Sequence, residues 1–592
     1  MHTSFLIPVY DTDAAVLRLC LNSALKAAGD RHEVVVIDDG SRCSETIDFL
    51  DRCEASGLDN LKMLKNSENS GVCYSLNKAA AVATGNLYAP VDHDDMVVPS
   101  GFATMWTFQI YYGGIWAYSD ELQINYKGIP IGPMYKPEYS PQLLRSVMYI
   151  NHLQLIPNTL FKSVGGYREG FEGSQDHDLA LRMSEQTKPQ HVRATAYLWR
   201  RDTVTLSVKD GRIGDISIKA SQRALEEHFE RQGLIADVKP YFLVPAPGKE
   251  PQATGTFVSR IIPLTMPKIS IVIPCKLGST TAVGTEALIV LEHCLLSICQ
   301  SVYEDGNSAS ALPELEIILV LNDEDDREHA NGLISSFNLS GFALCDESGF
   351  NFSRKCNLGA KHASGEIIVF LNDDTAFESK GWTFHVVSLL EEEDVACVGG
   401  LLLNSDHTVQ SCGDNVGRNS AVHYVPNTSA TSVGDAMHRY IADHETTSIT
   451  GAFICCKKKT FEDLGGFSLV FSNSFQDVDF CLRARLKQMR CLVSPHIRLL
   501  HFESVSRNPT VDDQTLNLIR HIHASTMGPT DPFALWAYEV PQPKLFSRTG
   551  VRYYISVLKK LIWRQAFVIL MYMRPGPSHP RHILNKNEWR IR

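Results

Sequence analysis

The segment Ser348–Thr375 reads SGFNFSRKCNLGAKHASGEIIVFLNDDT, and its pattern indicates how the chain folds. Ile367–Leu371 is an apolar run typical of a buried strand, and it continues into the polar cluster NDD at 372–374 with no turn signal between them. The preceding residues 357–364 predict a helix with Gly365 as its C-cap. Open α/β sheets bind ligands at the carboxyl ends of their strands, which makes NDD a candidate site. The alternative is an ordinary turn, because Asn and Asp are common turn residues.

The same pattern occurs earlier in the chain. Residues 70–95 read SGVCYSLNKAAAVATGNLYAPVDHDD, and a step of 15 residues leads from Asn77 to Asp92, as it does from Asn357 to Asn372. Further landmarks recur in the same order: FLIPVY at 5–10 and SIVIPC at 270–275, GGY at 165–167 and GGF at 465–467, QDHDLALR at 175–182 and QDVDFCLR at 476–483. The offset grows from 266 to 301 residues, which is far too long for a solenoid and predicts a tandem of two whole domains.

Composition narrows the class of protein. Of the 592 residues, 44% are hydrophobic and 21% are charged, which is ordinary for a globular protein. The net charge of −11 argues against a nucleic-acid partner, because no broad basic surface is available to neutralise phosphates. The 15 cysteines are scattered without zinc-finger spacing, and the chain starts without a signal peptide. No run approaches the roughly 18 apolar residues of a membrane span. We therefore expect free thiols and a cytoplasmic location.

Two acids follow the second predicted strand. Residues 4–10 predict a strand, 14–27 a helix and Val34–Ile37 a second strand, so this region is expected to form a βαβ unit. The second strand leads into Asp38 and Asp39, whose carboxylates can accept hydrogen bonds from a ribose or from the N–H of a base. A plain DDGS turn is the alternative.

The motif DHDD at 92–95 suggests a metal site. The sequence has neither a Walker A nor a GxGxxG motif, so we expect a metal to hold the phosphates of a bound nucleotide. The carboxylates of the motif are the hard oxygen ligands that Mg²⁺ or Mn²⁺ prefers. His93 is expected to point away from its neighbours, because side chains alternate at a strand end.

A further acid precedes a predicted amphipathic helix. Asp176 stands where an N-cap or first-turn acid would stand, so one interpretation is that it only stabilises the start of the helix. As a functional carboxylate it would take a proton from an acceptor hydroxyl. Asp178 and Arg182 recur as Asp479 and Arg483, and we expect these pairs to be mainly structural.

The second copy differs in detail. Its nucleotide strand, 316–321, leads into Asn322 and Asp323, so that an amide replaces the first acid of the pair. Asp477 repeats Asp176. His501 follows a short apolar run and could reach the same mouth, although a lone histidine is more often a satisfied core or surface residue.

The remaining segments connect or extend the copies. Residues 203–267 form a connector with a helix around 217–232 and a Pro/Gly-rich linker, VPAPGKEPQATG. The segment Arg548–Met573 mixes basic residues with Tyr, Trp, Ile and Leu, and it predicts a helix that either lies in a membrane interface or packs on the second domain.

With DDGS, DHDD, NDD and two QDxDxxLR segments in order, the chain resembles glycosyltransferase family 2 twice over, across about residues 4–202 and 268–510. It looks most like bacterial tandem enzymes that build O-antigen, capsule or related surface polysaccharides, often as rhamnosyltransferases. The resemblance implies an α/β fold with two tandem GT-A domains, each with a Rossmann-like, mostly parallel sheet, and a C-terminal helical tail. The expected domains are 1–202, the connector 203–267, 268–510 and the tail 511–592.

The resemblance also implies an inverting transfer from a nucleotide-diphospho-sugar, with Mn²⁺ or Mg²⁺ as cofactor. Asp176 and Asp477 would be the catalytic bases. The metal ligands would be Asp92, Asp94, Asp374 and His501, with Asp94 the direct ligand in the first copy. The nucleotide-sugar would contact Pro8, Tyr10, Asp38, Asp39 and Asp92 in the first copy, and Pro274, Asn322, Asp323, Asn372 and Asp373 in the second.

Two departures from the family pattern leave alternatives open. Leu198 stands about where relatives place the late histidine, and Asn322 replaces an acid. We expect a bifunctional, metal-dependent hexosyltransferase-type enzyme that acts on a growing or lipid-linked glycan, either free in the cytoplasm or peripheral on the inner face of the membrane. The alternatives are a carbohydrate-binding scaffold with degenerate domains and a nucleotidyltransferase, although IPVYDT lacks the basic phosphate-binding loop that the latter needs.

Overall fold

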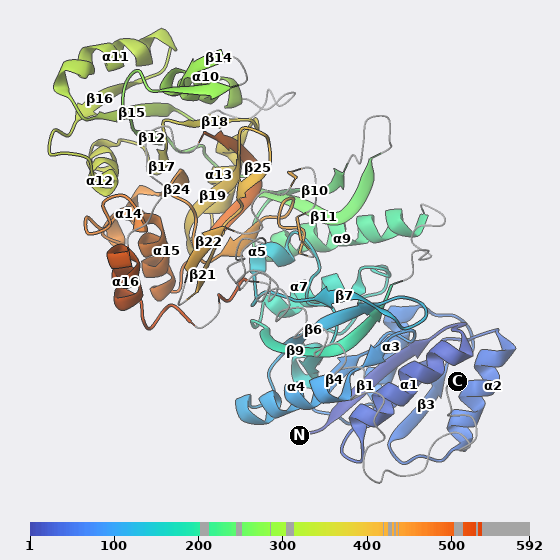
Figure 1. Ribbon diagram of the computed structural model, residues 1–592. Coiled ribbons are helices and arrows are strands. Elements are labelled where there is room, and N and C mark those ends of the chain that lie inside the picture. The colour runs from blue at the N-terminus through green and yellow to red at the C-terminus, as the bar shows by residue number, and fades with distance from the viewer. Residues whose placement is uncertain are drawn as a thin grey trace. The chain divides into compact units, whose positions relative to one another are not determined.

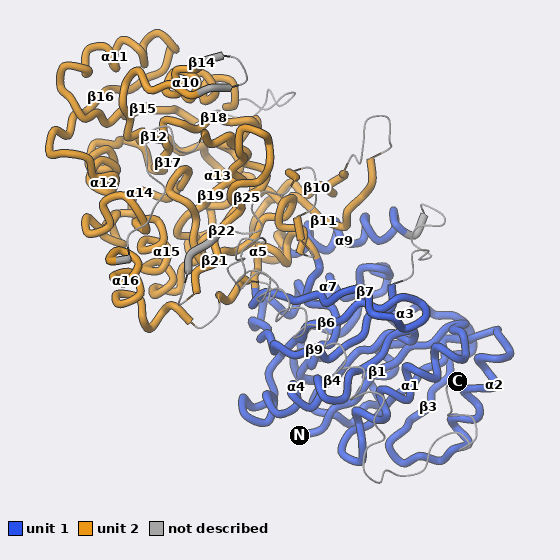
Figure 2. Tube along the Cα trace, viewed as in Figure 1, with its two compact units in different colours: residues 1–139, 148–228, 540–592 blue, residues 140–147, 229–539 orange. Residues whose placement is uncertain are grey.

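The computed structural model describes residues 1–201, 212–243, 251–283, 286–302, 313–417, 420–423, 429–430, 434–435, 437–502, 513–528 and 531–534. These residues divide into two compact units (Figure 2). Among them, unit 1 comprises 1–139 and 148–228, and unit 2 comprises 140–147 and those within 229–539. Each unit has its own large sheet, so the predicted pair of α/β domains is confirmed. The tail segment Arg548–Met573 lies outside the described residues.

The sheet of unit 1 has the strand order β3-β2-β1-β4-β8-β6-β9-β5, with β7 paired to β6. β1 (Thr3–Val9) lies between β2 (Glu33–Asp38) and β4 (Leu87–Pro90), and β3 (Leu61–Lys65) flanks β2, all in parallel. The other strands are β5 (Met96–Val97), β6 (Ala117–Ile124), β7 (Pro130–Met134), β8 (Gln154–Pro157) and β9 (Gln190–Arg200). Among them only β6 and β9 pair in parallel, so the Rossmann-like part is the β3-β2-β1-β4 half.

Helices cover both faces of this sheet (Figure 1). α1 (Ala14–Ala28), α2 (Ser44–Ala55) and α4 (Pro99–Tyr112) bury apolar residues against one face of β1 and β2. On the other face lie α3 (Val72–Val82) and α6 (Asn158–Ser163), whose Phe161 packs edge-on against Tyr88. α7 (Gln175–Ser184) completes the helices before the connector.

Unit 2 repeats this arrangement with the order β16-β15-β12-β17-β24-β19-β25-β18, in which β20 pairs with β19 and β23 with β25. The main strands are β12 (Ile269–Pro274), β15 (Leu315–Leu321), β16 (Gly341–Cys345), β17 (Ile367–Leu371), β18 (Thr375–Phe377), β19 (Val395–Leu403), β24 (Phe453–Lys457) and β25 (Arg490–His501). The short strands are β13 (Thr280–Val283), β14 (Glu286–Ile289), β20 (Val409–Ser411), β21 (Asp414–Gly417), β22 (Ser420–His423) and β23 (His444–Thr446). β17 has the predicted bounds, because five consecutive apolar residues are buried there on both faces.

The helices of unit 2 again form two layers. α10 (Val290–Ser301), α11 (Arg327–Ser336) and α13 (Trp382–Leu390) cover one face, and α12 (Phe352–His362), α14 (Lys458–Asp463) and α15 (Gln476–Leu486) cover the other. α16 (Asp513–Ile522) packs on α15 through Ile519, so this part of the predicted tail belongs to unit 2. A 3-10 turn, η1, spans Glu324–Asp326.

The connector is more structured than its composition predicts. It contains α9 (Arg212–Arg231) and a hairpin of β10 (Ala236–Leu243) and β11 (Gln252–Ile261). The end of the Pro/Gly-rich segment thus pairs as a strand, while 244–250 lies outside the described residues. Before β8, the short helix α5 (Pro141–Leu144) belongs to unit 2.

Gly365 was predicted to cap a helix, but it does not. α12 ends at His362 with Ala363 as its C-cap, and Gly365 lies where the chain enters β17. A Cβ at this glycine would lie 2.7 Å from the Lys268 carbonyl oxygen and the Ser270 nitrogen. Glycine is therefore required here because the backbone of β12 comes too close for a side chain.

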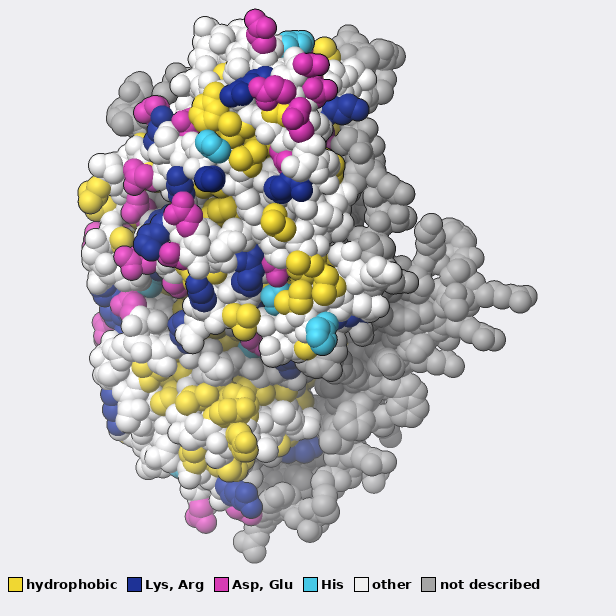
Figure 3. All heavy atoms as spheres, turned by 90° about the vertical axis from the view of Figure 1, so that its left-hand side faces the viewer, with side chains coloured by type: hydrophobic (Ala, Val, Ile, Leu, Met, Phe, Trp, Pro, Cys, Tyr) yellow, Lys and Arg dark blue, Asp and Glu magenta, His cyan; other side chains and the backbone are white. Residues whose placement is uncertain are grey.

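Charges are mixed over the face shown in Figure 3, where basic and acidic side chains alternate without a broad basic area. Within the described part of the chain, no helix combines the length and apolar character needed to cross a membrane.

Candidate active site

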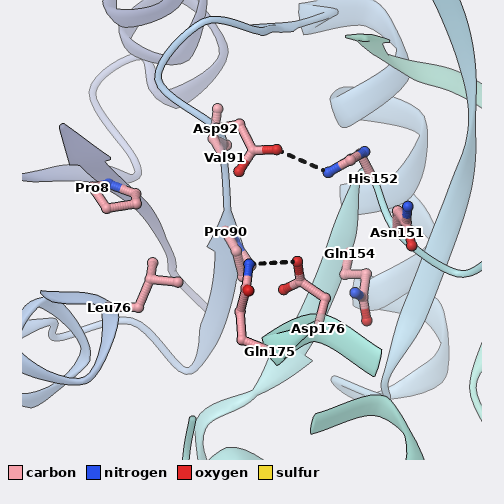
Figure 4. A pocket seen from close by; sticks show the side chains of 10 residues that line it. All are labelled: Pro8, Leu76, Pro90, Val91, Asp92, Asn151, His152, Gln154, Gln175 and Asp176. Carbon is pink, nitrogen blue, oxygen red and sulfur yellow. Dashed lines mark hydrogen bonds and ion pairs between the residues drawn. The ribbon is translucent and has the colours of Figure 1, made fainter. Parts of the chain in front are cut away.

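A pocket lies at the carboxyl ends of the parallel strands of unit 1 (Figure 4). It is lined by Pro8, Leu76, Pro90, Val91, Asp92, Asn151, His152, Gln154, Gln175 and Asp176. Three residues that the sequence predicts as functional, Pro8, Asp92 and Asp176, thus meet in one pocket. Tyr10 is 38% exposed just beyond β1. This is the edge at which open α/β sheets bind ligands.

Asp38 and Asp39 are buried at the end of β2. Asp38 Oδ1 accepts a hydrogen bond from the Ser41 backbone N–H at 2.9 Å. Asp39 accepts three, from Asn66 Nδ2 and from the backbone N–H groups of Ser70 and Gly71, at 2.7, 2.8 and 2.9 Å. These two acids therefore shape the loops beside the pocket, and a nucleoside contact by either of them remains a prediction.

Asp92 is the first of several charged side chains that contact one another in sequence from the pocket into the core. Its Oδ2 lies 3.2 Å from His152 Nε2, which Figure 4 marks as an ion pair. His152 Nδ1 lies 3.4 Å from Glu121 Oε2, and Lys136 Nζ lies 3.3 Å from the same oxygen. Burial alone would lower the pKa of His152, but the Asp92 and Glu121 carboxylates raise it well above its usual value. Neither His152 nor Glu121 was predicted from the sequence.

Asp95 and His93 of this motif have different partners. The Asp95 N–H donates to the Asp92 carbonyl oxygen at 3.1 Å, so the motif folds into a turn. Asp95 Oδ1 accepts a hydrogen bond from the Arg200 backbone N–H at 2.6 Å. His93 contacts Thr12 Oγ1 at 2.9 Å and so faces away from the acids, as predicted.

The residues that can hold a metal in unit 1 are Asp92, Asp95 and His152. One potential ligand atom of each lies within 4.8 Å of the others. Burial and the neighbouring Asp92 carboxylate raise the pKa of Asp95 well above its usual value, which shows that the pocket concentrates negative charge. Two carboxylates and an imidazole suit a divalent cation such as Mn²⁺. Asp94, the predicted direct ligand, is outside this group of described residues.

Asp176 lies in the first turn of α7 and lines the pocket. It accepts a hydrogen bond from Gln175 Nε2 at 3.2 Å and contacts the Tyr167 hydroxyl at 3.4 Å. Burial and the charge of Asp92 raise the pKa of Asp176 to about 6. A carboxylate with this pKa is ionised at neutral pH and still basic enough to accept a proton from a hydroxyl in a transition state.

In unit 2, Asp374 and His501 meet at the corresponding edge. His501 Nε2 lies 3.3 Å from Asp374 Oδ1 and 3.4 Å from Asn372 Nδ2, and its Nδ1 lies 2.6 Å from Gln410 Oε1. Asp374 Oδ1 is buried without a hydrogen-bond partner among the described residues. Burial and Asp374 raise the pKa of Asp373 to about 7, and its Oδ2 accepts the Lys276 N–H at 3.2 Å.

Asp477 lies in the first turn of α15, as Asp176 does in α7. Its oxygens accept the backbone N–H groups of Gly451 and Val478 at 2.7 and 2.9 Å. Burial and the nearby Asp414 carboxylate raise the pKa of Asp477 to about 6. The two predicted bases thus have the same shift, although different acids contribute to it.

The strand register corrects the predicted match between the end of β2 in unit 1 and the end of β15 in unit 2. Pro8 pairs with Ile37 in unit 1, and Pro274 pairs with Val320 in unit 2. Leu321 therefore occupies the place of Asp38, and Asn322 occupies that of Asp39. Asn322 and Asp323 are exposed. Instead of an acid, unit 2 has the buried Lys355, whose Nζ donates to the carbonyl oxygens of Val320 and Leu321.

The late histidine is also displaced by one position from the predicted match. Met96 pairs with Leu198 in unit 1, and Ala376 pairs with Leu500 in unit 2. The counterpart of His501 is therefore Trp199, whereas the pattern predicts Leu198. An indole cannot supply a metal ligand.

Known proteins match both copies. Residues 4–119 and 285–416 match the family model described as glycosyl transferase family 2. The chain is 30% identical over 507 residues to an O-antigen biosynthesis protein, RfbC, of Myxococcus xanthus, which covers 85% of this chain and 37% of that protein. It is 25% identical over 397 residues to an uncharacterized glycosyltransferase of Rickettsia felis, covering 63% of this chain and 61% of that one. The chain thus spans only part of the length of these relatives.

Matches among solved structures include TarS residues 1–349 of S. aureus, at 18% identity and a TM-score of 0.29, covering 39% of this chain and 72% of that one. Another is GalNAc-T7 with UDP, GalNAc and Mn²⁺, at 13% identity and a TM-score of 0.33, covering 44% of this chain and 48% of that one.

Proposed function

Since the chain belongs to glycosyltransferase family 2, we propose that it transfers sugars from nucleotide-diphospho-sugars to a growing bacterial surface polysaccharide, with one transfer site in each unit. The observation that carries this proposal is the pocket of unit 1, in which the candidate base Asp176 and the candidate cation ligand Asp92 line one cavity. Rhamnose is the sugar that the resemblance favours, and a glycan or lipid-linked glycan is the proposed acceptor. All 15 cysteines are free, which fits a cytoplasmic enzyme.

The chemistry follows from the separate tasks of these residues. Asp176 would accept the proton of the acceptor hydroxyl while that oxygen attacks the anomeric carbon in line, which inverts its configuration. Asp92 and its neighbours would hold a Mn²⁺ or Mg²⁺ ion, which neutralises charge on the departing diphosphate. The carboxylate cluster and the imidazole of His152 fit such an ion.

Unit 2 would perform a second transfer with a different donor contact. It keeps the base Asp477 and the pair of Asp374 and His501. It lacks both acids that end β2, because Leu321 and Asn322 stand in their places. The two sites are therefore expected to differ in the nucleoside or sugar that they accept.

The test is release of nucleoside diphosphate from a panel of nucleotide sugars in the presence of Mn²⁺. Asp176→Asn and Asp477→Asn should each remove a different addition, by at least about 10²-fold, because a positioned base contributes about that much. Asp463→Asn, which makes the same change on the surface of α14, should leave both additions intact. No turnover of any donor would instead favour the carbohydrate-binding scaffold, and loss of every addition from one variant would show a single working site.

A further inference from the structure

The register of the last strands leaves unit 1 without a counterpart of His501. His501 lies opposite Thr375, beside Asp374, whereas Trp199 occupies this position in unit 1. If both copies bind a divalent cation, the imidazole ligand of unit 1 has to come from another element. His152, from the loop before β8, lies 3.2 Å from Asp92.

We propose that unit 1 binds its divalent cation through Asp92, Asp95 and His152, with Glu121 orienting the imidazole, whereas Asp94 is not a ligand. The inference rests on the proposed function only for what the bound ion does in the reaction. The choice of ligands rests on the distances between these side chains. The two units would then hold the same kind of ion with imidazoles from different elements, the loop before β8 in unit 1 and β25 in unit 2.

The spacing of the three residues fits one coordination shell. Their potential ligand atoms all lie within 4.8 Å of one another. Two ligands on opposite sides of an ion with bonds of about 2.1 Å are about 4.2 Å apart, so a shift of a few tenths of an ångström would close the shell. Asp95 is already held by the Arg200 N–H at 2.6 Å, which leaves Oδ2 for a ligand bond.

The surroundings of His152 resemble those of a metal-binding histidine. Such residues almost always turn their second ring nitrogen to a carboxylate or carbonyl oxygen. Here Nδ1 faces Glu121 Oε2 at 3.4 Å, while Nε2 faces Asp92 Oδ2 at 3.2 Å. Neither His152 Nδ1 nor Glu121 Oε1 has a hydrogen-bond partner among the described residues, so a stronger contact can form between them.

Further contacts fix the position of the ring. It stacks on Tyr197 with 4.6 Å between centroids and 12° between planes. Lys136 Nζ donates to the His152 carbonyl oxygen at 2.7 Å and balances the buried charge of Glu121. A ligand held this firmly loses little entropy when an ion binds.

A plain ion pair between His152 and Asp92 is the competing explanation, and Mn²⁺ binding to the whole chain separates the two. In an Asp374→Asn/His501→Ala background, which removes the site of unit 2, electron spin echo modulation of added Mn²⁺ should show an imidazole nitrogen. His152→Gln should abolish this modulation. His93→Gln is the matched control, because His93 belongs to the motif but faces Thr12, and it should retain the signal.

Affinity for Mn²⁺, measured by titration calorimetry in the same background, tests the remaining ligands. Asp95→Asn should weaken binding strongly, Asp94→Asn should have little effect, and Glu121→Gln should cost about 10-fold to 100-fold. Strong loss with Asp94→Asn but not with Asp95→Asn, a persistent nitrogen signal in His152→Gln, or no Mn²⁺ binding at all would overturn the proposal. None of these readouts depends on sugar transfer, so an inactive chain that binds Mn²⁺ through His152 would refute only the proposed function.

Discussion

The two candidate bases have the same raised pKa but different neighbours. Burial raises both to about 6, with the help of Asp92 for Asp176 and of Asp414 for Asp477. A base must be ionised to accept a proton, so each addition should lose rate as the pH falls through about 6. Because the neighbouring acids differ, the two acid limbs can be shifted separately.

Replacing Asp414 by Asn should shift only the addition that depends on Asp477. Without the negative charge of Asp414, the ionised form of Asp477 is less disfavoured, so its pKa falls. The acid limb of that addition should move down by roughly half a pH unit to one unit, as measured from pH profiles of kcat/KM. The addition that depends on Asp176 serves as the internal control. An upward shift, or equal shifts in both additions, would contradict the assignment.

For single residues, the sequence predicts the types of functional side chain well. It predicts less well which of those side chains contact one another in the fold. Asp92 and Asp176 were predicted from their place after a strand and before a helix, and they line one pocket. The choice between Asp94 and Asp95 depends on how the turn after β4 folds, which no local pattern specifies. His152 is a single histidine in a loop without periodicity, so only tertiary structure reveals that it contacts Asp92.

The repeated landmarks are explained by paired structural contacts. In unit 1, Asn77 exchanges two hydrogen bonds with the Tyr167 backbone, at 2.8 and 2.9 Å, and Asn357 does the same with Phe467. The predicted structural role of Asp178 and Arg182 is confirmed. The Arg182 guanidinium donates hydrogen bonds to the Asp178 carboxylate and to the carbonyl oxygens of Val164 and Gly166. Such residues recur because each fixes one loop to one helix, which is why they made the duplication visible in the sequence.

One duplicated contact joins two neighbouring strands of each sheet, β1 and β2 or β12 and β15, to the loop that follows α3 or α12. Glu33 accepts hydrogen bonds from Ser4 Oγ at 2.5 Å and from the Thr84 N–H and hydroxyl, at 2.5 and 2.9 Å. Glu316 accepts the same set from Ser270 and Ser364. Burial alone would raise the pKa of Glu33, but Lys62, Ser4 and Thr84 lower it to about 2.

Glu33→Gln should therefore destabilise unit 1 in a pH-dependent way. The folded pKa lies below the usual 4.5, so the ionised carboxylate stabilises the fold above that value, and this contribution is lost as the pH falls toward 2. We expect a loss of about 1 to 3 kcal/mol at pH 7, and a smaller one at pH 4, from urea denaturation. Glu45→Gln, at an exposed position in α2, should change little. A penalty that is constant with pH would contradict the ionic basis of this contact.

In the whole molecule, the two units are not two consecutive segments of the sequence. The sequence predicts a first domain that ends at 202, because the repeat and the Pro/Gly-rich linker suggest a simple tandem. Residues 140–147 instead belong to unit 2. Gln142 N–H donates to Glu445 Oε1 at 3.1 Å, and the Arg145 guanidinium contacts Glu392 at 2.7 Å. No local pattern could predict this exchange, since both partners lie more than 240 residues away in sequence.

Arg145 is expected to stabilise unit 2, although it lies between segments of unit 1 in sequence. Its side chain is 7% exposed, and Glu392 also contacts Arg490, at 2.9 Å. Arg145→Met keeps most of the apolar stem but removes one of the two cations that face Glu392. Because Arg490 remains, the expected cost is about 1 to 3 kcal/mol, which is less than for a buried acid left entirely alone.

Hydrogen exchange on the full chain can locate this effect. In Arg145→Met, amides of β23 and β25 should exchange faster, because β25 carries Arg490 and β23 carries Glu445, while amides of β1 in unit 1 should be unchanged. Lys459→Met, which breaks an exposed ion pair with Asp463, is the control and should have almost no effect. Faster exchange in β1 to the same extent would mean that the two cores open together. An unchanged β23 would contradict the prediction, because the buried contact between Arg145 and Glu392 would then carry no free energy.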